Sequence, residues 1–225
     1  MASTRLPGKP LADIAGKPMI EHVWRRAMEA NIGRVIVATD DTEIAKAILS
    51  VGGEAVLTRP DHPSGSDRIA EALEIADPDG KIELIVNLQG DLPTLDPDSL
   101  RKCARLLNTG DADIGTLATI ENDAGEAANP NMVKVIGTKI GDKHLRALYF
   151  TRTLAPSGPG PFYHHIGIYT YRRAALQRFI NLPPSALEVR ERLEQLRWLE
   201  NNYTIKVAIT THEAIATDTP QDLDK

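Results

Sequence analysis

The sequence has few of the features that mark secreted, membrane-spanning or nucleic-acid-binding proteins. Its 225 residues include one cysteine, Cys103, so no disulfide can form within the chain, as is typical of a reducing cytoplasm. No apolar run approaches the roughly 20 residues that a membrane-spanning helix needs, and no apolar signal segment opens the chain. Basic residues are outnumbered by acidic ones, 26 to 31, which is unlike a general nucleic-acid binder. We therefore expect a cytoplasmic protein that binds neither membranes nor nucleic acid.

The first half of the chain alternates between apolar β-branched runs and segments with helical periodicity. Strands are predicted at residues 34–39, 54–58 and 82–88, and helices at residues 19–30, 42–50, 67–76 and 97–107. Alternation of this kind predicts an α/β fold with a mainly parallel sheet and helices on both faces. Ligands of such folds bind at the carboxyl ends of the strands.

The pattern changes after about residue 112, where the connections between apolar runs become short. Strands are predicted at residues 114–120, 132–136, 145–150 and 162–171. We interpret residues 113–172 as a smaller antiparallel lobe inserted into a single domain that spans residues 1–225. Helices at residues 173–180 and 187–201 and a strand at residues 204–210 then complete the chain.

The opening ten residues have the composition of a phosphate-binding loop. Small and hydroxylated residues, Ser3 among them, are followed by Arg5 and by Gly8-Lys9. Small side chains let backbone N–H groups approach an anion, and the two cations neutralise its charge. The Walker spacing is absent, no strand precedes the loop, and an ordinary Pro/Gly turn with surface cations is the alternative.

Two aspartates are candidates for holding a metal ion. Asp91 follows Gln89-Gly90 directly after the strongest predicted strand, a position suited to Mg²⁺ beside a bound phosphate. The alternative for Asp91 is an exposed residue in a strand-ending turn. Asp218 precedes Thr219-Pro220, and its local sequence favours a helix N-cap.

Further candidate residues lie in polar segments, each with a structural alternative. Ser66 and Arg68 lie in the turn-forming segment 62–68, where Ser66 or Asp67 is a natural N-cap and Arg68 either reaches a ligand or faces solvent. In the lobe and the helix after it, an arginine, a histidine and a Glu/Gln pair have the chemistry to bind a polyhydroxylated acid, with arginine matching its carboxylate. A satisfied, partly buried histidine and a helix face with i,i+3 and i,i+4 ion pairs at residues 191–197 are the alternatives. We interpret Cys103 as a small core residue.

Taken together, these segments resemble the 3-deoxy-manno-octulosonate cytidylyltransferase family, also called CMP-KDO synthetases. The matching segments run in family order across nearly the whole chain: residues 2–11, 16–20, 37–40, 62–68, 86–93, 129–131, 133–135, 148–152, 165–169, 193–197 and 218–220. So many ordered segments are far more specific than any one motif.

The resemblance implies a Rossmann-like nucleotidyltransferase fold and transfer of CMP from CTP to 3-deoxy-manno-octulosonate (KDO), with pyrophosphate released, for lipopolysaccharide synthesis. It implies that Arg5, Lys9 and Asp91 are catalytic and that the enzyme is a homodimer. It assigns the nucleotide to Ser3, Arg5, Lys9, Ser66, Arg68 and Gln89, Mg²⁺ to Asp91 and Asp218, and the sugar acid to Arg152, His165, Tyr169, Glu194 and Gln195.

The chain departs from the family pattern at its start. That pattern begins with a buried apolar strand ending Pro-Ala-Arg, and this sequence lacks the strand and its arginine, so we expect the first central strand to be missing. Ala216-Thr217 also stands where the family commonly has Gly-Val. The missing strand makes a truncated, non-catalytic nucleotide-binding relative one alternative. A cytidylyltransferase for another acidic sugar, such as sialic acid, is a second alternative, and residues 6–9 and 165–169 weigh against it.

Overall fold

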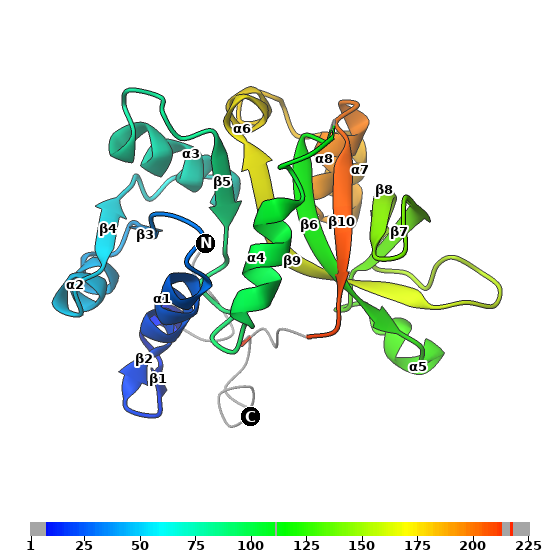
Figure 1. The fold of residues 1–225 in the computed structure, drawn as a ribbon, viewed down its shortest axis with the longest axis horizontal. Helices are drawn as coiled ribbons and strands as arrows, with labels where there is room; N and C mark the ends of the chain where they lie inside the picture. The colour runs from blue at the N-terminus through cyan, green and yellow to red at the C-terminus, as the bar shows by residue number, and fades with distance from the viewer. Residues whose placement is uncertain (1–7, 111, 213–216, 218–225) are drawn as a thin grey trace. The chain divides into compact units, whose positions relative to one another are not determined.

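The computed structural model describes residues 8–110, 112–212 and 217, which fall into two compact units (Figure 1). The N-terminal unit comprises the described residues of Met1–Glu83, Asn87–Arg101 and Ala214–Lys225. The C-terminal unit comprises those of Leu84–Val86 and Lys102–Glu213. No helix in the described ranges has both the length and the apolar character needed to cross a membrane.

The N-terminal unit is built around a β-α-β motif. Its elements are η1 (Lys9–Leu11), β1 (Asp13–Ile14), β2 (Lys17–Pro18), α1 (Met19–Ala30), β3 (Ile36–Thr39), α2 (Thr42–Ser50), β4 (Glu54–Leu57) and α3 (Gly65–Ala76). Strands β3 and β4 pair in parallel, from Ile36 opposite Glu54 to Thr39 opposite Leu57. Within the described residues, β4 is the only strand that pairs with β3, and the strands before α1 are the two-residue pair β1 and β2. The carboxyl ends of β3 and β4 therefore lie side by side.

Helix starts in this unit follow local capping chemistry. The Asp41 carboxylate accepts hydrogen bonds from the N–H groups of Glu43 at 2.7 Å and Ile44 at 3.4 Å, as the sequence predicts for the start of α2. Helix α3 begins at Gly65, two residues earlier than predicted, because Ser64 is its N-cap and accepts from the N–H of Asp67 at 3.3 Å. The expectation that Ser66 or Asp67 caps this helix was wrong.

The C-terminal unit contains a six-stranded sheet in the order β5-β9-β6-β10-β8-β7 (Figure 1). Its elements are β6 (Ile114–Glu121), α5 (Ala124–Ala127), β7 (Lys134–Lys139), β8 (His144–Thr151), β9 (Phe162–Arg172), α6 (Arg173–Phe179), α7 (Ala186–Glu191), α8 (Gln195–Glu200) and β10 (Ile205–Thr210). Strand β5 (Leu84–Asn87) and helix α4 (Pro97–Arg105) each contain residues that are assigned to both units. Pairing is parallel between β6 and β10 and antiparallel in β6–β9, β7–β8 and β8–β10, so this sheet is mixed. The strands within residues 113–172 pair with one another in the antiparallel manner that the sequence predicts for them.

The predicted single helix at residues 187–201 is two helices. Arg192 adopts a left-handed conformation (φ 56°) and the N–H of Leu193 donates to the carbonyl of Glu188 at 3.2 Å, which ends α7. Leu193 in this turn is buried, and α8 starts at Gln195. A helical pattern in sequence does not reveal such a break, because the polar spacing continues through it.

Few aromatic residues are present, yet they form a continuous ladder in the C-terminal unit. The rings follow one another in the order Phe150, His165, Tyr169, Tyr171, Trp198 and Phe179, with centroid separations of 5.0, 5.4, 5.8, 5.5 and 3.9 Å. Cys103 is fully buried in the same unit, where burial raises the pKa of its thiol to about 12. The interpretation of Cys103 as a core residue is therefore confirmed.

Candidate functional site

Lys9 and Asp91, both predicted from the sequence, form an ion pair in the N-terminal unit. The Lys9 Nζ lies 2.9 Å from the Asp91 Oδ2, and the two side chains are 10% and 32% exposed. Gly8 places Lys9 by adopting a left-handed conformation (φ 68°), after which the N–H of Leu11 donates to the Gly8 carbonyl at 2.8 Å and closes the η1 turn. A cation and a carboxylate are thus held together in a partly open position.

The main chain of Asp91 is bound to the residue that precedes Asp218 in the sequence. The N–H of Thr217 donates to the Asp91 carbonyl at 3.0 Å. Asp218, Ser3 and Arg5 lie outside the described residues. Among the residues that are described, no group of three or more His, Cys, Asp or Glu side chains is arranged to hold a metal ion. One carboxylate is nevertheless compatible with Mg²⁺, which commonly takes one or two carboxylates and completes its shell with water and phosphate oxygens.

Arg68 joins the carboxyl ends of β3 and β4. Its Nη1 donates to the Thr58 Oγ1 at 2.7 Å and lies 3.1 Å from the Asp40 Oδ1. Because the Arg68 side chain is only 14% exposed, the solvent-facing alternative does not apply. Asp40 and Thr58 were not predicted as partners, since nothing in local spacing connects residues so far apart in sequence.

Gln89 and Ser66 lie close to the start of α3 in different environments. The Gln89 Nε2 donates to the Asn87 Oδ1 at 3.1 Å, and a Cβ added at Gly65 would lie 3.5 Å from that same nitrogen. The Gln89 amide therefore lies against the first residue of α3. Ser66 is 1% exposed, so its side chain lies inside the unit.

The segment before α3 is held to the helix by Glu71. Its carboxylate forms a short hydrogen bond with the His62 Nε2 and accepts from the Arg59 N–H at 3.1 Å. The bond from His62 is the main cause of the lowered pKa of the Glu71 carboxyl. These contacts fix the segment that carries the α3 cap Ser64.

Arg152 follows β8 in the C-terminal unit and is held from several sides. Its Nη1 donates to the Pro130 carbonyl at 3.1 Å and its Nε to the Glu191 carbonyl at 3.3 Å. Its own N–H donates to the Glu191 carboxylate at 3.3 Å. The Glu191 carboxylate also accepts from the Tyr149 hydroxyl at 3.3 Å, so it belongs to the packing against β8 and not to ion pairs along its own helix.

His165 is neutral, and its surroundings set which nitrogen carries the proton. Its Nε2 lies 3.0 Å from the Thr116 Oγ1, which is also 2.7 Å from the Ile168 carbonyl. The single hydroxyl proton of Thr116 goes to that carbonyl, so Thr116 accepts from an Nε2–H and the Nδ1 of His165 keeps a lone pair. Burial, with a smaller contribution from His164, lowers the pKa of His165 to about 3. His165 is therefore a hydrogen-bonding group without charge near neutral pH.

The C-terminal unit brings His165, Tyr169 and Glu194 into one region. The rings of His165 and Tyr169 are 5.4 Å apart on β9, where the pairing with β6 shifts register. Such irregularities re-aim side chains from one face of a strand. Burial is the main reason that the pKa of Tyr169 is raised, followed by its neighbours Tyr171 and Glu194. Gln195, next to Glu194, is buried at the start of α8.

Arg197 forms its ion pair with a residue outside the segment 191–197. Arg197 binds the Glu188 carboxylate, nine residues earlier, through both Nε and Nη2, and its guanidinium lies 4.5 Å from the Phe179 ring. This pair holds α7 and α8 together. The i,i+3 and i,i+4 alternative for this segment is therefore not what the structure contains for Arg197.

The sequence profile of the cytidylyltransferase family matches residues 1–207. A relative from Azorhizobium caulinodans named 3-deoxy-manno-octulosonate cytidylyltransferase is 58% identical over 225 residues, covering all of this chain and 90% of the relative. A relative of the same name from Methylobacterium radiotolerans is 57% identical over 225 residues, covering all of this chain and 91% of the relative.

The chain belongs to the 3-deoxy-manno-octulosonate cytidylyltransferase family. A solved structure of CMP:2-keto-3-deoxy-manno-octonic acid synthetase complexed with CTP is similar to this cytidylyltransferase, with a TM-score of 0.90 and 38% identity over 99% of this chain and 91% of that one. A 4-diphosphocytidyl-2C-methyl-D-erythritol synthase from Anaerococcus prevotii is 13% identical with a TM-score of 0.64 over 98% of this chain and 92% of that one, a likeness of fold alone. The predicted Rossmann-like nucleotidyltransferase class is thereby confirmed.

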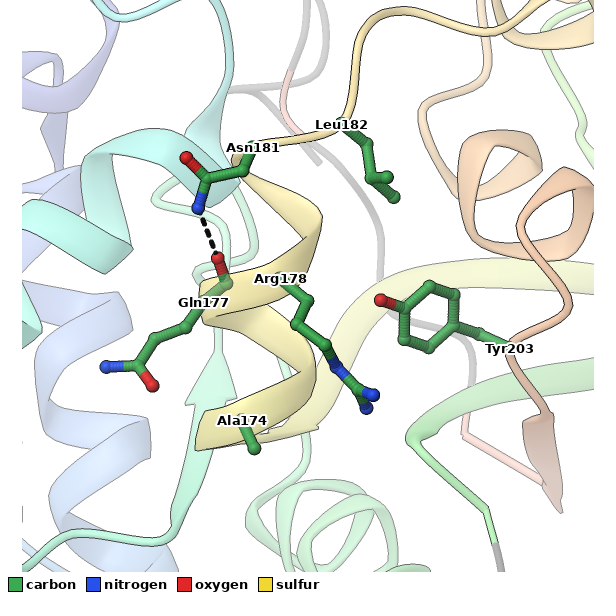
Figure 2. Close-up of a pocket in the computed structure, with 6 residues that line it drawn as sticks. All are labelled: Ala174, Gln177, Arg178, Asn181, Leu182 and Tyr203. Carbon is green, nitrogen blue, oxygen red and sulfur yellow. Dashed lines mark hydrogen bonds between the residues drawn. The ribbon is translucent and has the colours of Figure 1, made fainter.

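A surface pocket of this cytidylyltransferase lies beside α6 in the C-terminal unit. It is lined by Ala174, Gln177, Arg178, Asn181, Leu182 and Tyr203 (Figure 2). The Arg178 guanidinium lies 5.4 Å from the Tyr203 ring, and the Asn181 amide donates to the Gln177 carbonyl at 2.8 Å. None of the sequence-predicted site residues lines it.

Proposed function

We propose that this cytidylyltransferase transfers CMP from CTP to the anomeric hydroxyl of KDO and releases pyrophosphate. The observation that carries the proposal is the close match to relatives of that name over the whole chain. The chain's own chemistry agrees with it, because a cation and a carboxylate are paired in one unit and an arginine, a neutral histidine and a glutamate occupy the other. A cytoplasmic homodimer that serves lipopolysaccharide synthesis is part of the same proposal.

The triphosphate of CTP needs cations to neutralise it. Lys9 supplies one of them, and its present partner Asp91 is only partly buried, so the ammonium can exchange a carboxylate oxygen for a phosphate oxygen. We assign Ser3 and Arg5 to the same triphosphate. Charge that builds up on the leaving pyrophosphate is stabilised by Lys9 and Arg5 as the bond to the α-phosphorus breaks.

The nucleoside part of CTP is assigned to residues around the start of α3. Arg68 is held by Asp40 and Thr58, so its guanidinium has a fixed orientation beside the strand ends. The Gln89 amide, placed against Gly65, offers a donor and an acceptor suited to a pyrimidine edge. Ser66 borders the same region and supports it from inside.

Asp91 and Asp218 are proposed to hold Mg²⁺, which when bound neutralises phosphate charge and lowers the pKa of a coordinated hydroxyl. The fit rests on the exposed part of the Asp91 carboxylate and on Thr217, which is bound to the Asp91 main chain. Carboxylate oxygens are the protein ligands that Mg²⁺ commonly takes, and both residues supply them.

The sugar acid is assigned to residues of the C-terminal unit. Arg152 matches the KDO carboxylate, because a guanidinium binds a carboxylate through two parallel hydrogen bonds. Neutral His165 presents the Nδ1 lone pair as an acceptor for a sugar hydroxyl. Tyr169, Glu194 and Gln195 add hydroxyl, carboxylate and amide groups for the remaining hydroxyls.

The chemical step is an attack by the anomeric hydroxyl on the α-phosphorus with pyrophosphate as the leaving group. Positioning and charge stabilisation account for most of the catalysis in such transfers. The residues of this chain therefore act by holding the sugar acid in line with the leaving group, and by keeping fixed cations next to the phosphates.

The proposal is tested by measuring pyrophosphate release and CMP-sugar formation with CTP, Mg²⁺ and either KDO or sialic acid. We expect stoichiometric CMP-KDO and pyrophosphate with KDO alone. Product with sialic acid but not with KDO would identify the other acidic sugar, and CTP binding without turnover would identify a non-catalytic relative.

A substitution tests the assignment of Asp91. Asp91→Asn is expected to lower kcat by about 100-fold or more, because it removes the charge that holds Mg²⁺ beside the phosphates. Asp98→Asn is the matched control, since Asp98 is an exposed residue of α4 that pairs with Arg101. Near-normal activity of a folded Asp91→Asn protein at ordinary Mg²⁺ concentrations would contradict the assignment of Asp91 as a metal ligand.

A further inference from the structure

Lys134 is a fully buried lysine whose ammonium group is completely satisfied by main-chain oxygens. It is the first residue of β7 and is 0% exposed. Its Nζ donates to the carbonyls of Met132 at 2.6 Å, Arg152 at 2.6 Å and Asn129 at 3.2 Å. An ammonium has three hydrogens, and all three are used on neutral oxygens. Burying a charge is costly unless it is fully hydrogen-bonded, so this arrangement requires each of the three carbonyls.

The carbonyls that bind this ammonium come from two segments, and the proposed function assigns Arg152 of one of them to the sugar acid. Two belong to the loop of residues 129–133, and the third belongs to Arg152 itself. The same loop accepts the guanidinium of Arg152 through the Pro130 carbonyl at 3.1 Å. It also accepts the N–H of His165 through the Val133 carbonyl at 2.8 Å. The loop is therefore a shared support for Arg152 and His165.

Glu191 holds Arg152 from the opposite side of its main chain. The Arg152 N–H donates to the Glu191 carboxylate, while the Arg152 carbonyl accepts from Lys134. One residue is thus fixed through both of its peptide groups. Burial and the charge of Arg152 lower the pKa of Lys134, and the charge of Glu191 opposes them.

We propose that Lys134 is a positioning residue that fixes the Arg152 guanidinium for the carboxylate of the anionic sugar substrate. The inference rests on the proposed function, in which Arg152 binds that carboxylate. A bidentate contact between guanidinium and carboxylate depends on orientation, because both groups are planar and their hydrogen bonds are parallel. An apolar side chain in place of Lys134 fills the same space but cannot hold the loop of residues 129–133 against Arg152.

The test is Lys134→Met, with the steady-state KM measured separately for KDO and for CTP. We expect the KM for KDO to rise about tenfold or more, because small displacements of a binding group have effects of this size or larger, while the KM for CTP stays within twofold. Lys139→Met, at the exposed far end of β7, is the matched control and leaves both constants unchanged. A folded Lys134→Met protein with a lower active fraction but an unchanged KM for KDO would show a purely structural role and overturn the proposal.

A double substitution shows whether Lys134 acts through Arg152. Lys134→Met added to Arg152→Ala should raise the KM for KDO by less than twofold beyond Arg152→Ala alone, because the group being positioned is already absent. Independent, multiplicative effects would overturn the proposal. If Lys134→Met does not fold, Glu191→Ala is the second variant. It removes the carboxylate that accepts the Arg152 N–H, at a partly exposed helix end, and the same selective rise in the KM for KDO is expected. An unchanged KM for KDO in that protein would equally overturn it.

The outcomes separate this inference from the proposed function. A wild-type protein that forms no CMP-KDO contradicts the proposed function and with it the substrate named here. A raised KM for KDO in Arg152→Ala with an unchanged KM in Lys134→Met contradicts only the positioning role of Lys134.

Discussion

Replacing His165 by glutamine should reduce the dependence of the protein's stability on pH between pH 7 and pH 5. Burial lowers the pKa of His165 from its ordinary 6.5 to about 3, so the unfolded chain binds this proton before the folded one does. The stability that comes from a neutral His165 is therefore present above pH 6.5 and is lost progressively as the pH falls towards 3. Glutamine carries no titrating group and can still donate to the Thr116 hydroxyl.

The magnitude follows from the two pKa values. A difference between 6.5 and about 3 corresponds to about 5 kcal/mol of unfolding free energy, at about 1.4 kcal/mol for each tenfold change. Between pH 7 and pH 5, only part of this is lost, about 2 kcal/mol. Most carboxylates titrate below pH 5, so this window isolates the histidine contribution.

The assay is urea unfolding at pH 7 and pH 5, followed by tryptophan fluorescence. The drop in unfolding free energy on going to pH 5 should be about 2 kcal/mol smaller in His165→Gln than in the wild type. His212→Gln, at an exposed position, is the matched control and keeps the wild-type drop. Equal drops in wild type and His165→Gln would refute the argument that His165 is buried in its neutral form.

Two further outcomes follow from local contacts. Asp41→Ala removes the side-chain cap of α2 and should lower the free energy of unfolding, measured by urea titration, by about 1 kcal/mol. An unchanged free energy of unfolding would mean that the hydrogen bonds from Glu43 and Ile44 make no net contribution to stability. Cys103 should react with a thiol reagent only after denaturation, because it is fully buried and the pKa of its thiol is raised to about 12. Rapid labelling of the folded protein would contradict this burial.

The local parts of the fold could be predicted because they depend on local chemistry. The strand over residues 34–39, the helix that follows Asp41 and the end of β5 near Asp91 all follow from β-branched runs and capping residues. The break at Arg192 could not be predicted, because it arises from burying Leu193 and not from a proline or glycine. The order of strands in the mixed sheet is likewise set by long-range pairing, which single-sequence periodicity does not encode.

The candidate site also contains residues that could be predicted from the sequence and residues that could not. Lys9 and Asp91 belong to recognisable chemical patterns, and their side chains form an ion pair in the structure. Their roles in binding phosphate and metal stay predictions. Asp40 was not predicted as a partner of Arg68, because their contact joins the end of β3 to a helix that lies far along the sequence. Lys134 was not assigned a role, because Val-Lys-Val alternation is typical of a strand with its lysine in solvent. Its burial depends on three carbonyls that only the folded chain brings together.

The ladder of rings in the C-terminal unit gives the protein an optical reporter. Tyr169 and Tyr171 are stacked towards Trp198 in steps of less than 6 Å, so light absorbed by these tyrosines is passed to the indole by energy transfer. Any ligand that tilts or polarises Tyr169 therefore changes the emission of a tryptophan that it does not touch. With Trp24 of α1 replaced by phenylalanine, Trp198 is the remaining indole, and its spectrum should respond, without an added dye, to a ligand bound at Tyr169, the region that we propose for the sugar acid.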